Sequence, residues 1–166
     1  WPLFLVGVQP TLDKNTRQFL GPIPKSWGPN TQLQLRGPLG HGFNLPRATR
    51  RIALVNFGGQ ITRLLPLIQP ALHAEADITI FTPSILPPLP PAVEIHPLDA
   101  LPASLSWADF LIIDLPFEFL PRLRSFLGLE PFAGLPCAAQ ALVHTPMPCA
   151  GIGDCGACAV PARKKG

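Results

Sequence analysis

Three of the four cysteines lie within ten residues of one another, and their spacing suits an iron–sulfur cluster. Cys149, Cys155 and Cys158 form the pattern C-x5-C-x2-C. Iron in such clusters takes soft thiolate ligands, which must converge on a small volume. A loop can bring three thiolates together only if its backbone folds tightly, and three glycines give it that freedom: Gly151, Gly153 and Gly156. The pattern therefore predicts a metal site whose ligands are Cys149, Cys155 and Cys158.

The same cysteines leave two other interpretations open, and the fourth ligand is not evident. Zinc also accepts clustered cysteines, but zinc sites favour paired C-x2-C knuckles and this chain has one such pair. Cysteine is also a common small buried residue. Cys137 lies twelve positions before Cys149, in or beside a predicted strand, and could face the core instead of a metal. His144, at the end of that strand, could bind a metal or simply be exposed.

The composition describes a globular protein and excludes several classes. The chain has 166 residues, of which 47% are hydrophobic and 14% charged, so it has apolar material for a core and too little charge for a disordered chain. A net charge of +3 is too small to indicate nucleic-acid binding, and no apolar run approaches the roughly 18 residues that cross a bilayer. Clustered cysteines suit a metal better than disulfides, and the sequence has no basic leader, so we expect a cytoplasmic protein.

From residue 51 onward, strands alternate with helical segments, which predicts a parallel α/β sheet that is buried on both faces. The helical segment Ile61–Ala74 contains Pro66 and Pro70, which should restrict or shorten the regular helix. A second helix is expected at Phe117–Leu127. The predicted strands are Ile52–Phe57, which is a continuous apolar run, and Asp77–Phe81, Val93–His96, Phe110–Leu115 and Ala138–His144.

The segment before this sheet has a different sequence pattern, which predicts short strands and turns. Leu3–Val8 is an apolar run, and Thr31–Arg36 alternates leucines with polar residues, which predicts a half-buried strand. A glycine-rich bend, Arg36–Phe43, follows. We place the domain boundary near residues 47–51.

Two segments resemble those of a known protein family: Arg36–Phe43, which reads RGPLGHGF, and Met147–Val160, which contains the cysteine pattern. Together with the α/β segment between them, they resemble the electron-transfer subunit of dihydroorotate dehydrogenase, in the ferredoxin–NADP reductase-like superfamily. The resemblance implies a β-barrel that binds FAD, a nucleotide-binding α/β domain and a [2Fe-2S] cluster in a C-terminal loop. It also implies that electrons pass between FAD and a partner subunit in pyrimidine biosynthesis.

Several cofactor-binding positions carry over with the resemblance. Asn15 and Thr16 stand where the family has Gly-Thr against the flavin, and Gly37 and Pro38 belong to the GPLG segment. The pair Gly58-Gly59 stands in the nucleotide-binding turn. Another flavin segment of the family would precede Trp1, and its fourth cluster cysteine would follow Gly166. We therefore expect this sequence to be a piece of a longer chain.

The nucleotide site departs from the family pattern in two places. Its turn reads NFGGQ at residues 56–60 in place of a Gly-Gly-Gly-Ile-Gly-type run, and Phe57 and Gln60 would add bulk where phosphate needs bare backbone. Where the family has Cys-Gly-Pro, the chain reads Asp114-Leu115-Pro116. Asp114 could bind a ligand at the strand end or cap the following helix. We do not expect NAD(P)H to bind.

These observations predict an electron-transfer subunit that depends on a catalytic oxidoreductase partner. Its parts would be a partial FAD-binding-type barrel at residues 1–46, a degenerate NAD-binding-type α/β domain at 47–145 and a [2Fe-2S]-type cysteine loop at 146–166. FAD would belong to the complete protein. The alternatives are a non-catalytic interaction module stabilised by zinc, and an NAD(P)H-dependent flavin reductase with a divergent nucleotide loop.

Overall fold

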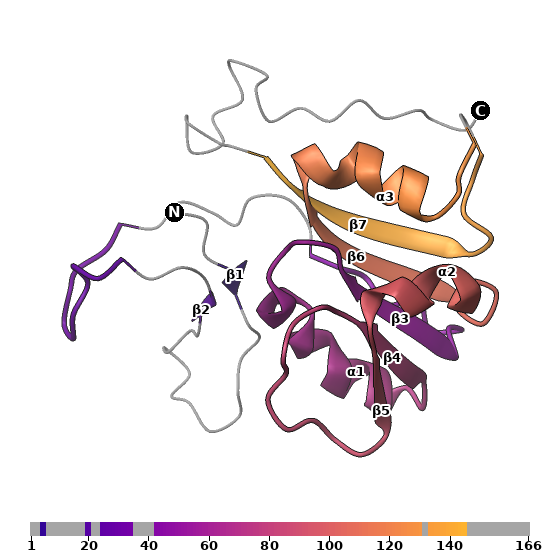
Figure 1. Cartoon of the computed structure of the whole chain (residues 1–166). Coiled ribbons are helices and arrows are strands. Elements are labelled where there is room, and N and C mark those ends of the chain that lie inside the picture. Colours follow the sequence, from indigo (N-terminus) through magenta and orange to yellow (C-terminus); the bar gives the residue numbers. More distant parts are fainter. Residues whose placement is uncertain (1–3, 6–18, 21–23, 35–41, 131–132, 146–166) are drawn as a thin grey trace. The chain divides into compact units, whose positions relative to one another are not determined.

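The computed structural model describes residues 4–5, 19–20, 24–34, 42–130 and 133–145 (Figure 1). The chain divides into two compact units, Trp1–Gly40 and His41–Gly166.

In the first unit, the described residues form one short antiparallel pair. Strand β1 (Phe4–Leu5) pairs with β2 (Phe19–Leu20). The predicted strand Thr31–Arg36 is wrong in its described part, because residues 31–34 are exposed and take no strand structure. Thr31 instead closes a turn, where its hydroxyl donates to the carbonyl of Gly28 at 2.8 Å, and Leu33 remains 43% exposed. Alternation of leucines without a neighbouring strand to pair with does not make a strand.

The second unit is built on a parallel sheet, as predicted. Within the described residues its order is β5-β4-β3-β6-β7, and every neighbouring pair is parallel. The strands are β3 (Arg51–Asn56), β4 (Asp77–Phe81), β5 (Val93–His96), β6 (Phe110–Pro116) and β7 (Ala138–His144). The chain adds β4 and β5 on one side of β3, then crosses over and adds β6 and β7 on the other. The strand order therefore reverses between β3 and β6.

Helices cover both faces of this sheet (Figure 1). On one face, Leu64, Ile68 and Ala71 pack with Leu54 and Ile112 of the central strands. On the other face, residues of α2 (Leu101–Ser104) and α3 (Leu120–Phe126) pack against Ala53, Val55, Leu111 and Ile113. Successive side chains of a strand point to opposite faces, so a strand buried on both faces is apolar along most of its length. This explains why the three central strands could be recognised from their apolar residues.

The prolines break the helical segment after β3 into three pieces. Those pieces are η1 (Ile61–Arg63), η2 (Leu65–Leu67) and α1 (Ile68–His73), the first two being 3-10 turns. Pro66 lies at the start of η2 and Pro70 in the first turn of α1. At these positions a missing backbone N–H costs no helical hydrogen bond. The segment is helical, as predicted, but it contains no long α-helix.

The second predicted helix, Phe117–Leu127, is also divided. It consists of η4 (Phe117–Phe119) followed by α3, with Pro121 in the first turn of α3. The short elements η3 (Leu98–Ala100) and α2 were not predicted.

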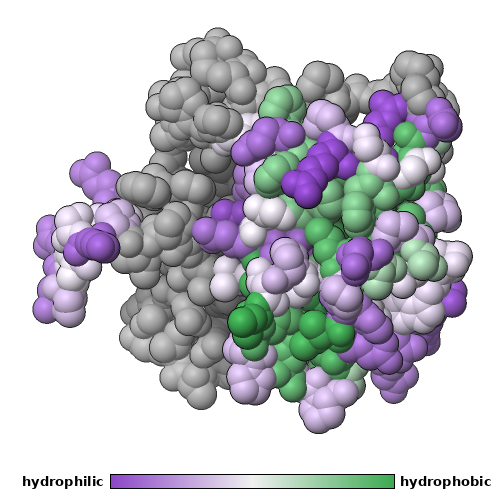
Figure 2. Space-filling model, viewed as in Figure 1, coloured by the Kyte–Doolittle hydropathy of each residue, from purple (hydrophilic) through white to green (hydrophobic). Residues whose placement is uncertain are grey.

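On the face seen in Figure 2, apolar side chains gather over α3 and over the region of α1 and the β4–β5 loop. That loop contains Ile85, which is fully exposed.

Candidate functional site

Polar side chains line up across the carboxyl ends of four parallel strands. We call them the polar row: Thr82 directly after β4, Asn56 at the end of β3, Asp114 in β6 and His144 at the end of β7. Asn56 lies two residues after Leu54, and Asp114 two residues after Ile112, both of which face α1. Because strand side chains alternate, the row lies on that same face of the sheet. The end of an apolar strand is the place where a polar residue is least costly, since the sheet stops there.

Asp114 is the centre of a buried ion cluster. Its side chain is 0% exposed, and Arg63 Nη1 lies 3.3 Å from Oδ1 and 3.5 Å from Oδ2. His144 Nε2 contacts both Asp114 Oδ1 and Arg63 Nη1. The Arg63 side chain is only 9% exposed, and this burial lowers the pKa of its guanidinium while Asp114 acts in the opposite direction. A carboxylate buried to this degree requires such partners, because an isolated buried charge is very costly.

The Gly58-Gly59 turn lies directly against this cluster. Gly58 has φ +83°, and a Cβ at that position would collide with the ring of Phe119. A Cβ on Gly59 would lie 2.5 Å from Asp114 Oδ1 and 2.9 Å from Oδ2. Both residues must therefore be glycine, one for backbone conformation and one because the Asp114 carboxylate takes the space where its side chain would be.

The structure corrects two expectations about this turn. Phe57 does not add bulk beside Gly58-Gly59, because its side chain is 4% exposed and packs in the core against Phe119 and Phe126. Asp114 does not cap the helix that follows β6: η4 has no side-chain cap, and the carboxylate binds Arg63 and His144 instead. The Asp114 carboxylate fills the space beside Gly59, and the Phe119 ring fills the space beside Gly58.

At the other end of the polar row, Asn56 is 1% exposed and bonds to the β4–β5 loop. Its Nδ2 donates to Thr82 Oγ1 at 3.2 Å and to Ser84 Oγ at 3.4 Å. Among the described residues, Asn56 Oδ1 has no hydrogen-bond partner. The row thus divides into a neutral half at Asn56 and Thr82 and a charged half at Asp114.

The predicted metal and flavin residues lie outside the described ranges. These are Cys149, Cys155 and Cys158, together with Asn15, Thr16, Gly37 and Pro38. Of the predicted site residues, the structure describes Gly58 and Gly59. Among the residues it describes, no group of three or more histidines, cysteines or carboxylates is placed to hold a metal.

Two residues considered as a fourth metal ligand have other surroundings in the structure. Cys137 precedes β7 and packs against the core on the α3 side, and burial raises the pKa of its thiol. A raised pKa disfavours the thiolate form that binds iron or zinc. His144 is not simply exposed, since it contacts Asp114 and Arg63. Cys137 and His144 stand at opposite ends of β7, roughly 23 Å apart at about 3.3 Å per residue.

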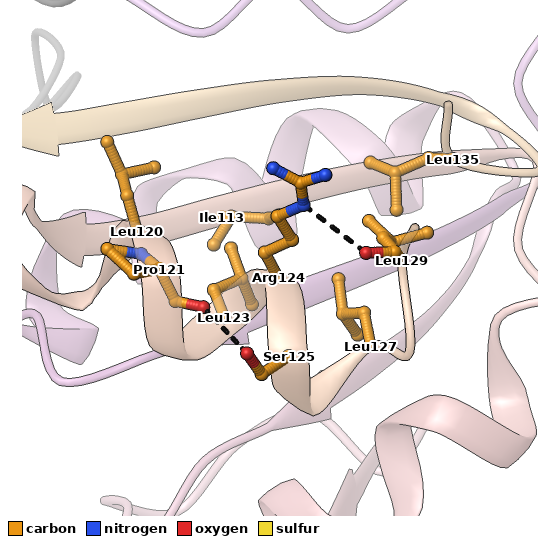
Figure 3. Close-up of a pocket in the computed structure, with 9 residues that line it drawn as sticks. All are labelled: Ile113, Leu120, Pro121, Leu123, Arg124, Ser125, Leu127, Leu129 and Leu135. Atoms are coloured by element: carbon orange, nitrogen blue, oxygen red, sulfur yellow. Dashed lines mark hydrogen bonds between the residues drawn. The ribbon is translucent and has the colours of Figure 1, made fainter. Parts of the chain in front are cut away.

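A hollow of about 660 Å³ lies beside α3 (Figure 3). Its lining is mostly leucine and isoleucine, and it contains two polar side chains, Arg124 and Ser125. Arg124 Nε donates to the carbonyl of Leu129 and Ser125 Oγ to that of Pro121. Those two side-chain groups stabilise the backbone of α3 and the turn after it. We assign no ligand to this hollow.

Arg63 is the residue of the cluster that the sequence did not reveal. Its partner Asp114 is 51 positions away, and nothing local to Arg63 marks it as part of a site. The signal that could have found it is the combination of a charged residue just after the glycine turn with a carboxylate ending a neighbouring apolar strand. In a parallel sheet both must lie at the same edge.

Comparison of the chain with models of known families, with curated proteins and with solved structures finds no match. Within the part of the chain that the structure describes, no helix has the length and apolarity needed to cross a membrane.

Proposed function

We propose that the protein is an electron-transfer subunit in which Cys149, Cys155 and Cys158 hold a [2Fe-2S] cluster. The observation that carries this proposal is the C-x5-C-x2-C spacing, with glycines between the cysteines. The cluster would pass electrons to or from a catalytic oxidoreductase partner, such as a dihydroorotate dehydrogenase-like enzyme. The chain itself would carry out no bond chemistry.

The architecture of the second unit supports this proposal. The sheet order β5-β4-β3-β6-β7 corresponds to strands 3-2-1-4-5 of a doubly wound nucleotide-binding domain. A domain of this type, followed by a cysteine loop, is what the resemblance to the reductase-like flavoproteins implies. The cysteine segment begins five residues after the end of β7. Fold alone does not establish function, so the cysteines remain the deciding feature.

The buried cluster supports the expectation that NAD(P)H does not bind to the α/β domain. Dinucleotide sites bring the pyrophosphate against a glycine turn and the N-terminus of the following helix. Here the Asp114 carboxylate lies against Gly59, and the turn is followed by the three-residue 3-10 element η1. In our proposal the domain serves as a scaffold for the cluster and a docking surface for the partner.

Flavin binding is a second part of the proposal, for the complete protein. Asn15 and Thr16 would contact the flavin, and Gly37 and Pro38 would shape the neighbouring bend. Cys137 is a poor fourth metal ligand, since burial raises the pKa of its thiol. For Cys137 and Cys149 to share a cluster, the five residues after His144 would have to run back along β7 almost fully extended, at about 3.5 Å per residue.

The experiment is an anaerobic purification of the protein at its natural length, followed by iron, sulfide, zinc and flavin analysis and a visible spectrum. We expect about two irons and two sulfides per chain, the content of a [2Fe-2S] centre. Cys155→Ser should abolish the cluster, and Cys137→Ser, as the matched control, should retain it. Bound zinc without iron would replace this proposal with the zinc-stabilised interaction module. Steady-state oxidation of NADH or NADPH would replace it with the flavin reductase.

A further inference from the structure

The Gly58-Gly59 turn lies where parallel α/β sheets usually bind ligands. It follows β3, and the strand order reverses between β3 and its neighbour β6. At such a reversal the loops after the two strands diverge to opposite faces, and phosphate-bearing ligands bind between them against glycine backbone. Asn56 at the end of β3 pairs directly with Asp114 of β6.

That place is taken by a carboxylate of the chain itself. Asp114 is fully buried and lies so close to Gly59 that a Cβ there would come within 2.5 Å of Oδ1. A carboxylate and a phosphate are both anions with hydrogen-bond-accepting oxygens. The Asp114 carboxylate thus places acceptor oxygens beside the turn, where the oxygens of a ligand phosphate would otherwise lie.

The groups that contact the Asp114 carboxylate are side chains instead of a helix end. Arg63 approaches both carboxylate oxygens, at 3.3 and 3.5 Å, and His144 contacts Oδ1. The segment after the turn has no α-helix until α1 begins at Ile68, so the dipole of a long helix does not act at this position. Arginine is the side chain best suited to bind phosphate or carboxylate oxygens in pairs.

We propose that the turn, Arg63 and His144 form an anion site that the chain fills with its own Asp114 carboxylate, which excludes phosphate-bearing ligands. This inference does not depend on the cysteine segment or on the electron-transfer function. A ligand phosphate would have to share the site with a buried negative charge and would find its space already filled. The ligand class of the opened site is a phosphate or pyrophosphate anion.

The test measures the binding of inorganic pyrophosphate by calorimetry and by the amide signals of Gly58 and Gly59. We expect no binding to the wild-type protein, and at least tenfold tighter binding to Asp114→Gly, which removes both the charge and the bulk. Asp114→Asn removes the charge and keeps the size, so its gain should be smaller. Adding Arg63→Gln to Asp114→Gly should abolish the gain.

Asp109→Gly is the matched control, because it also removes an aspartate from an arginine partner. Asp109 pairs with Arg51 at the opposite edge of the sheet, away from the Gly58-Gly59 turn. We expect no gain there. Pyrophosphate binding by the wild type, an equal gain in Asp109→Gly, or a folded Asp114→Gly without a gain would each overturn the proposal. If Asp114→Gly does not fold, Asp114→Ala, which also removes the charge and most of the bulk, decides in its place: tighter binding than wild type supports the proposal, and none overturns it.

Discussion

Asp109 directly precedes β6 and Asp114 lies near its carboxyl end; Asp109 pairs with Arg51 at the start of the neighbouring strand β3, and Asp114 pairs with Arg63 in η1, which follows β3. Asp109 bonds to Arg51 at 2.7 Å, with a side chain that is 35% exposed. Asp114 pairs with Arg63 at 3.3 Å and is fully buried. The two pairs have the same chemistry in different surroundings, one partly exposed to solvent and one in the protein interior. They should therefore differ sharply in what their loss costs.

Replacing Gly59 by alanine should destabilise the fold. The new Cβ would lie 2.5 Å from Asp114 Oδ1, and the carboxylate cannot move freely because Arg63 and His144 hold it. Overpacking of this kind typically costs about 1–3 kcal/mol. Thermal and urea unfolding measure the loss. Gly42→Ala is the control, because nothing lies within 4 Å of a Cβ at Gly42, and it should unfold like the wild type. Equal stability of the two variants would contradict the packing of Asp114 against the turn.

Replacing Asp114 by alanine should lower the free energy of unfolding more than any substitution in the Arg51–Asp109 pair. It leaves the Arg63 guanidinium buried without its carboxylate, and breaking a buried pair typically costs about 3–5 kcal/mol. Such a loss is smaller than the stability of many domains, about 5–15 kcal/mol, so the variant can still be measured. Adding Arg63→Met should recover part of the stability, because it removes the buried guanidinium that has lost its carboxylate. A double variant less stable than Asp114→Ala alone would contradict this account.

How far the sequence predicts the fold depends on how far each element is determined locally. β3 and β6 could be recognised because strands buried on both faces are apolar along most of their length, and their parallel direction followed from the alternation with helices. The strand expected at Thr31–Arg36 failed because a period of two describes one exposed face and does not supply a partner strand. The short helix α2 was missed because four residues carry too little periodicity to detect.

The site was predictable where it depends on strand ends and not where it depends on pairing at a distance. Asp114 was noted because it ends an apolar strand, and Gly58 and Gly59 because two glycines follow another. Phe57 was placed wrongly beside the turn, because the sequence does not tell to which face the last side chain of a strand turns. The pair Arg63–Asp114 joins segments 51 residues apart and appears only when the sheet is assembled.

Acid should weaken the fold through Asp109. Its hydrogen bond from Arg51 lowers the pKa of the Asp109 carboxyl below the ordinary value of 3.8. A carboxyl group whose pKa is lower when folded stabilises the protein above its unfolded-state pKa, and this contribution is lost as the pH falls through the folded pKa. The melting temperature of the wild type should therefore fall on acidification below pH about 4. In Asp109→Asn this part of the pH dependence should be absent, and an unchanged acid limb would show that the pair does not act on stability.

Cys137 should react slowly with thiol reagents in the folded protein. Its side chain packs against the core, and burial raises the pKa of its thiol. Alkylation proceeds through the thiolate, so both effects reduce the rate. Labelling with iodoacetamide near pH 8, followed by peptide mass spectrometry, should show Cys137 modified more slowly in buffer than in guanidinium chloride. The comparison within one protein provides the control, since the reagent and pH are constant. Equal rates in the two conditions would mean that Cys137 is accessible, and it would then return as a candidate fourth ligand for the cysteine cluster.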